Sequence, residues 1–307
     1  MASRRTRGEV LHIYTLVNNE GPGTLAGSLR SLGPPPEPGR AISLSPIAMR
    51  LALAVAVLFL SACESPDSPR LDNAADSLAF GITEGAGGLR AFQSLPGLQW
   101  EWAVVQDSSE RMRTRHVWDQ RGDRARVEWP VGGDSVLVAV YNPSTFDPDA
   151  PTGTASLNGQ TLTGTELAER LTEANQRFIN DGYWLLAPLK VLDEGVSRQV
   201  DTESGFDRLA LSFDGVGLTP GDRYWIEVEP VTGSMTGWSY ALESGNEGRW
   251  EWTDPVELVT PDGPLVLSRV KVSDDGRTVI TTDPVALAEI DETEFTDMTP
   301  RLRILGG

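Results

Sequence analysis

The sequence has little of what metal binding or nucleophilic catalysis requires. Of its 307 residues one is a cysteine, Cys63, and two are histidines, His12 and His116. One cysteine excludes disulfides within the chain and cysteine-based metal sites, and two histidines this far apart do not indicate a multi-histidine centre. The sequence also lacks a glycine-rich phosphate loop and a nucleophile elbow. We therefore expect no catalytic residue, no metal and no cofactor, and hence a protein that is not an enzyme.

Basic residues are scarce as well. The chain has 26 Lys+Arg against 44 Asp+Glu, and because residues 1–62 hold six Arg and three Glu, the remainder carries a net charge of −21. Its only lysines are Lys190 and Lys271. Such a surface repels nucleic-acid phosphates, which argues against a nucleic-acid partner. It also repels anionic lipid head groups, so membrane attachment should depend on acyl chains.

No hydrophobic run near the N-terminus is long enough to span a bilayer, which takes about 20 apolar residues. The run from Leu51 to Leu60 has ten apolar residues, with Arg50 before it and small residues after it. That pattern is typical of a secretory signal, although a buried strand with an inert cysteine is the alternative. The ending "LSAC" is similar to the bacterial lipobox. This resemblance implies cleavage between Ala62 and Cys63 and acylation of Cys63, for example with palmitate.

The rest of the N-terminal part has no periodic apolar pattern. We interpret residues 1–48 as a disordered extension from a mis-assigned start, with translation beginning at Met49, or else as a genuine cytosolic prefix. Residues 49–62 form the expected lipoprotein signal peptide, and residues 63–76 a flexible tether. Residues 77–307 are long enough for a single β-rich domain.

Alternating apolar residues predict strands over most of that domain. Trp100 and Trp102 fall on one strand face and Glu101 on the other. Arg121-Gly122-Asp123 and Asn158-Gly159 predict hairpin turns, with the glycine of each at positive φ. Similar alternation continues through "DRYWIEVEP", "GRWEWTDPVEL" and "LVLSRVKVS". In all, the pattern predicts about ten antiparallel strands.

Two helices are expected beside these strands. The first covers roughly residues 75–92 and is interrupted by glycines. The second covers Thr165–Asn180, with Thr163 and Glu166 as a capping box and Asp181-Gly182 as its end. Its apolar stripe is Leu167, Leu171, Ala174 and Phe178. Because a large meandering sheet tends to curl around a helix, we expect an α+β fold, mainly antiparallel β, in which helices cover the concave face of a curled, partly closed barrel.

Four segments carry a resemblance to a known family: "GGLRAF" at 87–92, "NDGYWLLAPLKVLDEG" at 180–195, "DRYWIEVEPVTGSMTGWSY" at 222–240 and "RWEWTDPVEL" at 249–258. They resemble the LolA/LolB-like superfamily of periplasmic lipoprotein carriers, in its uncharacterised bacterial lipoprotein branch. The resemblance covers most of residues 75–300. It implies an unclosed barrel, a half-barrel whose concave face is covered by helices over a hydrophobic cavity. A lipid anchor makes the chain more similar to LolB, the membrane-bound acceptor, than to soluble LolA.

The aromatic residues are the candidate ligand site, since a concave sheet lined with rings holds apolar ligands. The candidate cavity residues are Trp100, Trp102, Leu167, Leu171, Phe178, Trp184, Trp225, Trp238, Trp250 and Trp252. The first hypothesis is a lipid-anchored envelope protein that binds a lipid or lipoprotein acyl chain and exchanges it by opening the long helix. The alternative is a non-catalytic docking module of an envelope complex, in which the same rings fill the core. We expect a monomer that faces the periplasm, at the outer rather than the inner membrane.

Overall fold

The computed structural model describes residues 73–202, 208–213 and 222–303. Cys63, the expected signal peptide and residues 1–48 lie outside the described residues. The first described element, helix α3 (Ala74–Gly85), begins within the segment expected to be a tether, so residues 74–76 are helical. Asn73 caps this helix by accepting a hydrogen bond from the backbone N–H of Asp76 at 3.0 Å.

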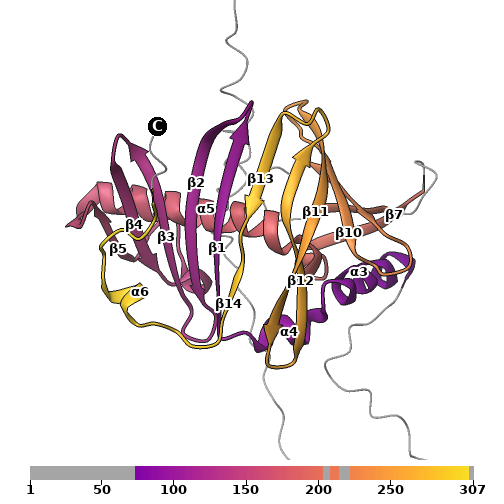
Figure 1. Ribbon diagram of the computed structural model, residues 1–307, viewed down its shortest axis with the longest axis horizontal. Helices are drawn as coiled ribbons and strands as arrows, with labels where there is room; N and C mark the ends of the chain where they lie inside the picture. Colours follow the sequence, from indigo (N-terminus) through magenta and orange to yellow (C-terminus); the bar gives the residue numbers. More distant parts are fainter. Residues whose placement is uncertain (1–72, 203–207, 214–221, 304–307) are drawn as a thin grey trace, which may run out of the picture. The chain divides into compact units, whose positions relative to one another are not determined.

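A single antiparallel sheet of 14 strands forms most of the described part (Figure 1), more than the ten or so expected. Its first half runs outward from the centre as a meander. These strands are β1 (Gly97–Gln106), β2 (Ser109–Asp119), β3 (Arg124–Gly132), β4 (Ser135–Tyr141), β5 (Gly153–Leu157) and β6 (Gln160–Thr161). A short 3-10 helix, η2 (Pro143–Thr145), separates β4 from β5.

The second half of the sheet returns from the opposite edge to the centre, where β13 pairs with β1. Its long strands alternate apolar and polar residues, as the sequence predicts. They are β7 (Val196–Asp201), β8 (Arg208–Phe213), β9 (Arg223–Val228), β10 (Met235–Ala241), β11 (Glu247–Thr260), β12 (Gly263–Ser273) and β13 (Thr278–Thr282), followed by β14 (Val285–Leu287), which pairs with the start of β1.

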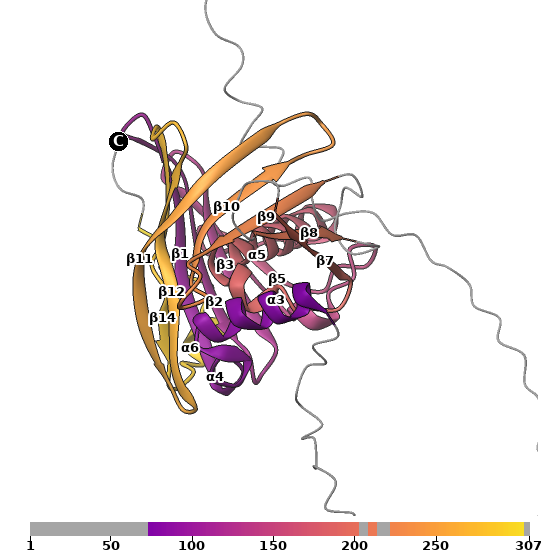
Figure 2. The same cartoon turned by 90° about the vertical axis from the view of Figure 1, so that its right-hand side faces the viewer.

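Helix α5 (Gly164–Lys190) connects the two outermost strands, β6 and β7, and crosses one face of the sheet (Figure 1). Its 27 residues span about 40 Å at about 1.5 Å each. Thirteen flat strands about 4.8 Å apart would place the two edges about 58 Å apart. The helix is shorter than this distance, so the sheet curls around it. Figure 2 shows α3 and α4 (Gly88–Ser94) on the same side as α5. The predicted curled, open α+β architecture is therefore confirmed.

The break between α3 and α4 also agrees with the sequence pattern, and one glycine there is required by contact as well as by conformation. Gly87 has φ of 101°, and a Cβ at this position would lie 2.2 Å from the carbonyl oxygen of Pro264. The neighbouring Ala86 carbonyl accepts from the backbone N–H of Val266 at 3.0 Å. These contacts fix the end of α3 to the start of β12.

Helix α5 does not end where the sequence indicated. It continues through Asp181-Gly182 to Lys190, with Pro188 inside its last turn. Tertiary contacts stabilise the helical conformation here. Asp181 is hydrogen-bonded to His116 on β2. Gly182 lies beside Trp100, since a Cβ on this glycine would be 4.0 Å from the indole ring. The predicted capping box is wrong too: Thr163 is at the N-cap, but its side chain makes no capping hydrogen bond.

The turn between β2 and β3 corrects a second detail. The positive φ belongs to Asp123, at 49°, and not to Gly122. Gly122 is needed for space, since a Cβ there would lie 2.1 Å from the Asp119 carboxylate. In the other predicted hairpin, Asn158 and Gly159 both have positive φ, at 49° and 83°, as a tight two-residue turn requires.

A buried ionic network lies on the face of the sheet opposite α5. Arg126 and Glu128 on β3 are both 0 % exposed, and Glu128 bonds Arg126 at 2.6 Å and Arg115 at 2.9 Å. The C-terminal segment, residues 291–302 with the short helix α6 (Thr293–Thr296), covers these charges. Glu294 bonds Arg115 at 2.7 Å, and Arg126 donates to the carbonyls of Glu294 and Thr299.

Among the described residues, no helix has both the length and the apolar character needed to cross a bilayer.

Candidate functional site

The concave face of the sheet carries two groups of aromatic rings, each built around one residue of α5. Phe178 is the centre of the first group, with its ring 5.6 Å from Trp100 and 5.6 Å from Trp118. Trp100 also stacks on His116, its cross-strand neighbour, at 4.5 Å. On the side of β3–β5, Leu171 is fully buried and Leu167 packs beside it. This part of α5 thus covers the first half of the sheet.

Trp184, six residues further along α5, is the centre of the second group. Its ring lies 5.1 Å from Trp250 and 6.3 Å from Trp238, while Trp238 lies 6.4 Å from Trp252. Trp250 and Trp238 are directly paired across β11 and β10. The four indoles are 6–8 % exposed, which makes them slightly more accessible than Trp100 at 0 %. The second half of the sheet therefore packs on α5 through indole rings.

Trp102 belongs to neither ring group, but it is 2 % exposed and packs in the same core as the indoles of both. Trp225 is the one candidate tryptophan outside this core. It alternates with the buried Tyr224 and Ile226 along β9, so its ring lies on the outer face of the sheet. There it lies under the guanidinium groups of Arg208 and Arg223, at 5.6 Å and 6.0 Å. The structure thus does not bring Trp225 together with the other nine candidates.

Several polar atoms among these rings have no hydrogen-bond partner in the part of the chain that the structure describes. They include the indole N–H groups of Trp100, Trp102 and Trp252, and Nδ1 of His116. Buried polar groups in folded proteins are nearly always hydrogen-bonded, to protein or to water. The concave face therefore offers unused donors within an apolar surrounding.

His116 is a packed histidine, and its partner comes from α5. Its Nε2 lies 2.8 Å from one carboxylate oxygen of Asp181, and the other oxygen of this carboxylate accepts from the side-chain amide of Asn180 at 3.0 Å. Burial lowers the pKa of His116, and the Asp181 carboxylate opposes this shift. The pair fastens α5 to β2.

Lys271 on β12 is the least expected residue of the concave face. It is 0 % exposed, and its ammonium group lies 4.6 Å from the centre of the Trp252 ring. It donates to the Ser268 carbonyl and to the Thr282 hydroxyl, both at 2.7 Å. No carboxylate among the described residues forms an ion pair with it, and burial lowers its pKa well below the ordinary value, against a smaller opposing effect of Asp283.

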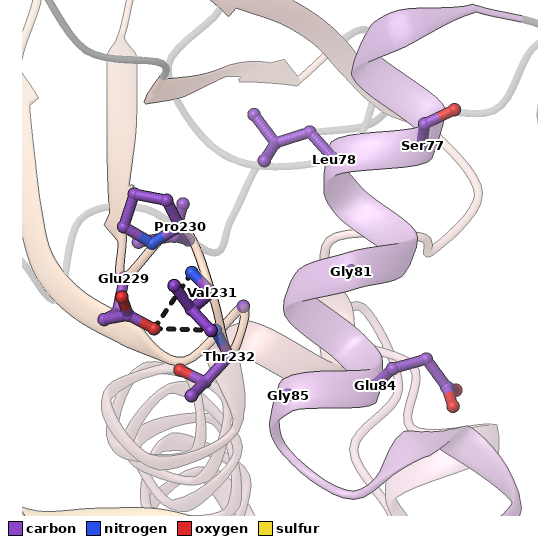
Figure 3. Close-up of a pocket in the computed structure, with 11 residues that line it drawn as sticks. Ser77, Leu78, Gly81, Glu84, Gly85, Glu229, Pro230, Val231 and Thr232 are labelled. Carbon is purple, nitrogen blue, oxygen red and sulfur yellow. Dashed lines mark hydrogen bonds between the residues drawn. The ribbon is translucent and has the colours of Figure 1, made fainter.

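A pocket of about 710 Å³ lies between α3 and the turn that joins β9 to β10 (Figure 3). Leu78 points from α3 toward the turn, whereas Glu84 points away from it. The Glu229 carboxylate is occupied within the turn, where it accepts from the backbone N–H groups of Val231 and Thr232. The pocket is lined by Ser77, Leu78, Gly81, Glu84, Gly85, Val228, Glu229, Pro230, Val231, Thr232 and Gly233.

None of the ten candidate cavity residues lines this pocket. Two of its walls nevertheless belong to the same interior, because Leu78 and Val228 pack against the core that contains the indoles. A sequence signal for the pocket exists in Gly81 and Gly85, which lie four residues apart on one face of α3. Gly85 permits close approach, since a Cβ there would lie 2.6 Å from the backbone of Gly233.

The described residues contain no group of three or more His, Cys, Asp or Glu side chains placed to hold a metal ion. No protein-family model matches the sequence, and no curated protein matches it.

Several solved structures are similar to this chain, among them three that each cover 71 % of it. A DUF1329 family protein from Desulfovibrio piger has 8 % identity, a TM-score of 0.38 and 94 % of its own length covered. A LolA superfamily protein from Nitrosomonas europaea has 13 % identity, a TM-score of 0.37 and 97 % of its own length covered. An outer membrane lipoprotein-sorting protein domain from Vibrio parahaemolyticus has 9 % identity, a TM-score of 0.35 and 94 % of its own length covered. The open sheet expected from the sequence is present in this chain on the evidence of its own strand order.

Proposed function

We propose that this protein is a lipid-anchored envelope protein that binds an apolar ligand, a lipid or a lipoprotein acyl chain, beneath the helices of its curled sheet. The observation that supports this proposal best is the pocket between α3 and the β9–β10 turn. Its volume of about 710 Å³ lies within the usual range of about 300–1,000 Å³ for small-molecule sites. Leu78 and Val228 connect its wall to the indole-rich core, so an acyl chain that enters along these two residues meets an apolar path toward that core.

The ligand needs more room than the core leaves free, because the indoles of the second ring group are packed at 6–8 % exposure. Binding therefore requires movement of α3 or α5 away from the sheet. The contact of α3 with the β9–β10 turn is made through two glycines, Gly85 and Gly233, and contains few side chains to separate. On this proposal α3 separates from the β9–β10 turn while its C-terminal end stays fixed to β12.

Titration with a fluorescent fatty acid tests the binding. The full chain carrying Cys63→Ala, which excludes its own acyl chains, should show saturable quenching of tryptophan fluorescence at micromolar ligand. Gly81→Leu should weaken binding about tenfold. Gly81 lines the pocket, and a Cβ there meets nothing within 4 Å, so a larger side chain at this position takes up pocket volume.

Gly81→Ala is the matched control for this experiment, since a methyl group occupies little of the pocket, and its affinity should stay near that of the parent chain. Absence of saturable binding by the parent chain, or equal affinity of the leucine and alanine variants, would refute the proposed entrance.

The anchor is a separate part of the proposal and has its own test. Cells expressing the chain and fed a labelled palmitate should incorporate label into it, and Cys63→Ala should abolish the incorporation. Fractionation of the membranes should place the labelled protein in the outer membrane. A Cys63→Ala protein that is still labelled would rule out acylation at this cysteine.

One observation favours the docking module as a second candidate. Seven of the ten candidate cavity residues are buried, six of them in one core cluster and Leu171 in a second, as expected of a filled core. On this alternative the indoles only stabilise the sheet, and no apolar probe binds at micromolar concentration. The same titration therefore distinguishes the two functions.

A further inference from the structure

We propose that Lys271 and the polar groups beside it form a head-group site for the carboxylate of an acyl-chain ligand. The inference rests on the proposed function and specifies its ligand class as a long-chain carboxylate. It starts from the position of Lys271 on the concave face. Lys271 is paired with Trp252 on the neighbouring strand β11 and with Ile280 on the other neighbouring strand, β13.

The groups around the amine match what a carboxylate requires. Lys271 is paired with Trp252 in one row across the sheet, and Thr282 is paired with Trp102 in the neighbouring row on the same face. The hydrogen bond from the Lys271 amine to the Thr282 hydroxyl joins the two rows. Both indole N–H groups lack a partner among the described residues. A carboxylate accepts up to about four hydrogen bonds and forms its strongest ones with charged donors. Donors of both kinds are therefore available in these two rows.

The charge balance of the interior supports an anionic rather than a neutral head group. Lys271 forms no ion pair among the described residues, and a buried ammonium without a counter-charge is costly. Asp283, on the segment after β13, is the charged group that acts on it electrostatically, and its effect is smaller than that of burial. A bound carboxylate would supply the missing counter-charge, so the amine would take up a proton as the ligand binds.

The apolar surroundings fit the remainder of such a ligand. Lys271 belongs to the same concave face as the indoles of the second ring group, and Leu265 and Leu267 lie on its own strand, both buried. Leu265 is next to the contact between β12 and the end of α3, and α3 forms one wall of the pocket. An acyl chain whose carboxylate lies at Lys271 can thus extend along apolar residues toward the pocket.

Calorimetry with two probes of equal chain length, dodecanoate and 1-dodecanol, tests the site on the full chain carrying Cys63→Ala. At about pH 8 dodecanoate is ionised, and its binding should be accompanied by net proton uptake. Proton uptake is measured as the difference in apparent enthalpy between two buffers of unlike ionisation enthalpy. Lys271→Met should abolish the uptake and weaken dodecanoate binding about tenfold or more, while 1-dodecanol affinity stays unchanged. Retained 1-dodecanol binding also demonstrates that the variant is folded.

Two further variants complete the experiment. Lys190→Met removes the other lysine, whose ammonium is half-exposed and paired with Asp193, and should change neither affinity nor proton uptake. Thr282→Val should weaken dodecanoate binding but not 1-dodecanol binding.

The outcomes separate this site from the proposed function. If dodecanoate and 1-dodecanol bind equally, without proton uptake and without an effect of Lys271→Met, the head-group site is wrong and the apolar site stands. If neither probe binds, the proposed function itself fails.

Discussion

Replacement of Glu128 by glutamine should destabilise the protein strongly, because this carboxylate is fully buried and fully used. One of its oxygens accepts from Arg126 at 2.6 Å and from Arg115 at 2.9 Å. The other accepts from the backbone N–H groups of Arg301 and Leu302, both at 2.7 Å. Glutamine has the same shape but a single accepting oxygen. Two of the four donors would therefore face an NH₂ group.

The size of the effect follows from the burial of the partners. Arg126 is 0 % exposed and Arg115 6 %, so neither guanidinium can turn to water when the carboxylate loses its charge. Breaking one side of a buried ion pair costs about 3–5 kcal/mol. For a unit of this size that corresponds to a fall in melting temperature of roughly 6–20 °C. Burial opposes the ionisation of Glu294, but the hydrogen bond and charge of Arg115 outweigh it and lower its pKa, so one carboxylate remains ionised in the network.

Urea unfolding followed by circular dichroism measures this loss. Hydrogen exchange should show in addition that the amides of Arg301 and Leu302 lose protection, since they donate to the replaced oxygen. Glu292→Gln is the matched control, because Glu292 lies in the same C-terminal segment and pairs with Arg124 at the surface. Its unfolding midpoint should equal that of the parent chain. If Glu128→Gln also unfolds at the parental midpoint, the buried network does not stabilise the fold.

Two other predictions concern α3 and the interior histidine. Gly81→Ala should raise the free energy of unfolding by about 0.5–1 kcal/mol, whereas Gly85→Ala should lower it by about 1–3 kcal/mol. The reason is that only a Cβ at Gly85 meets the backbone of Gly233, at 2.6 Å. Urea titrations of both variants measure the difference, and a change of the same sign in both variants would contradict this contact. Burial lowers the folded-state pKa of His116 below its ordinary value, so the unfolded chain binds a proton that the folded chain does not. Stability should therefore fall as the pH drops below about 6.5, by up to about 1.4 kcal/mol per pH unit, and His116→Gln should remove this slope in unfolding measured between pH 7 and pH 5.5.

The strand faces could be predicted from the sequence because alternation is a local property. Trp100 and Trp102 lie on the concave face as expected, and the Asn158-Gly159 turn has the expected backbone. The same rule places Trp225 on the outer face. In "DRYWIEVEP" it alternates with Tyr224 and Ile226, so a period of two separates it from the core-facing residues although the stretch as a whole is apolar.

The end of α5 could not be predicted in this way, since the reason for its length is the distance between the sheet edges. Asp181-Gly182 is typical of a helix end, but in the structure Asp181 bonds His116 on a strand 65 positions away in sequence. The buried network also depends on contacts between residues far apart in the sequence. Arg126 and Glu128 lie on the polar face of β3, and only the position of the C-terminal segment buries them. For Lys271 the sequence predicts the position but not the burial of a charge. Its alternation with Leu265 and Leu267 places it on the core face, where a lysine is unusual.

A purely structural role for Lys271 makes a different prediction from a ligand-binding role. β12 and β13 pair only over Val270–Val272, so the carbonyl of Ser268 lies beyond the end of that ladder. The amine donates to this carbonyl, but the hydroxyl of Thr282 already donates to it at 3.0 Å. The carbonyl is therefore satisfied without the lysine. Methionine is similar in length, fills the same apolar space and removes a buried amine. Lys271→Met should accordingly leave the free energy of unfolding unchanged or raise it by about 1 kcal/mol, as measured in urea. A loss of several kcal/mol would mean that the amine is retained for the fold, whereas preserved stability together with lost dodecanoate binding would mean that it is retained for the ligand.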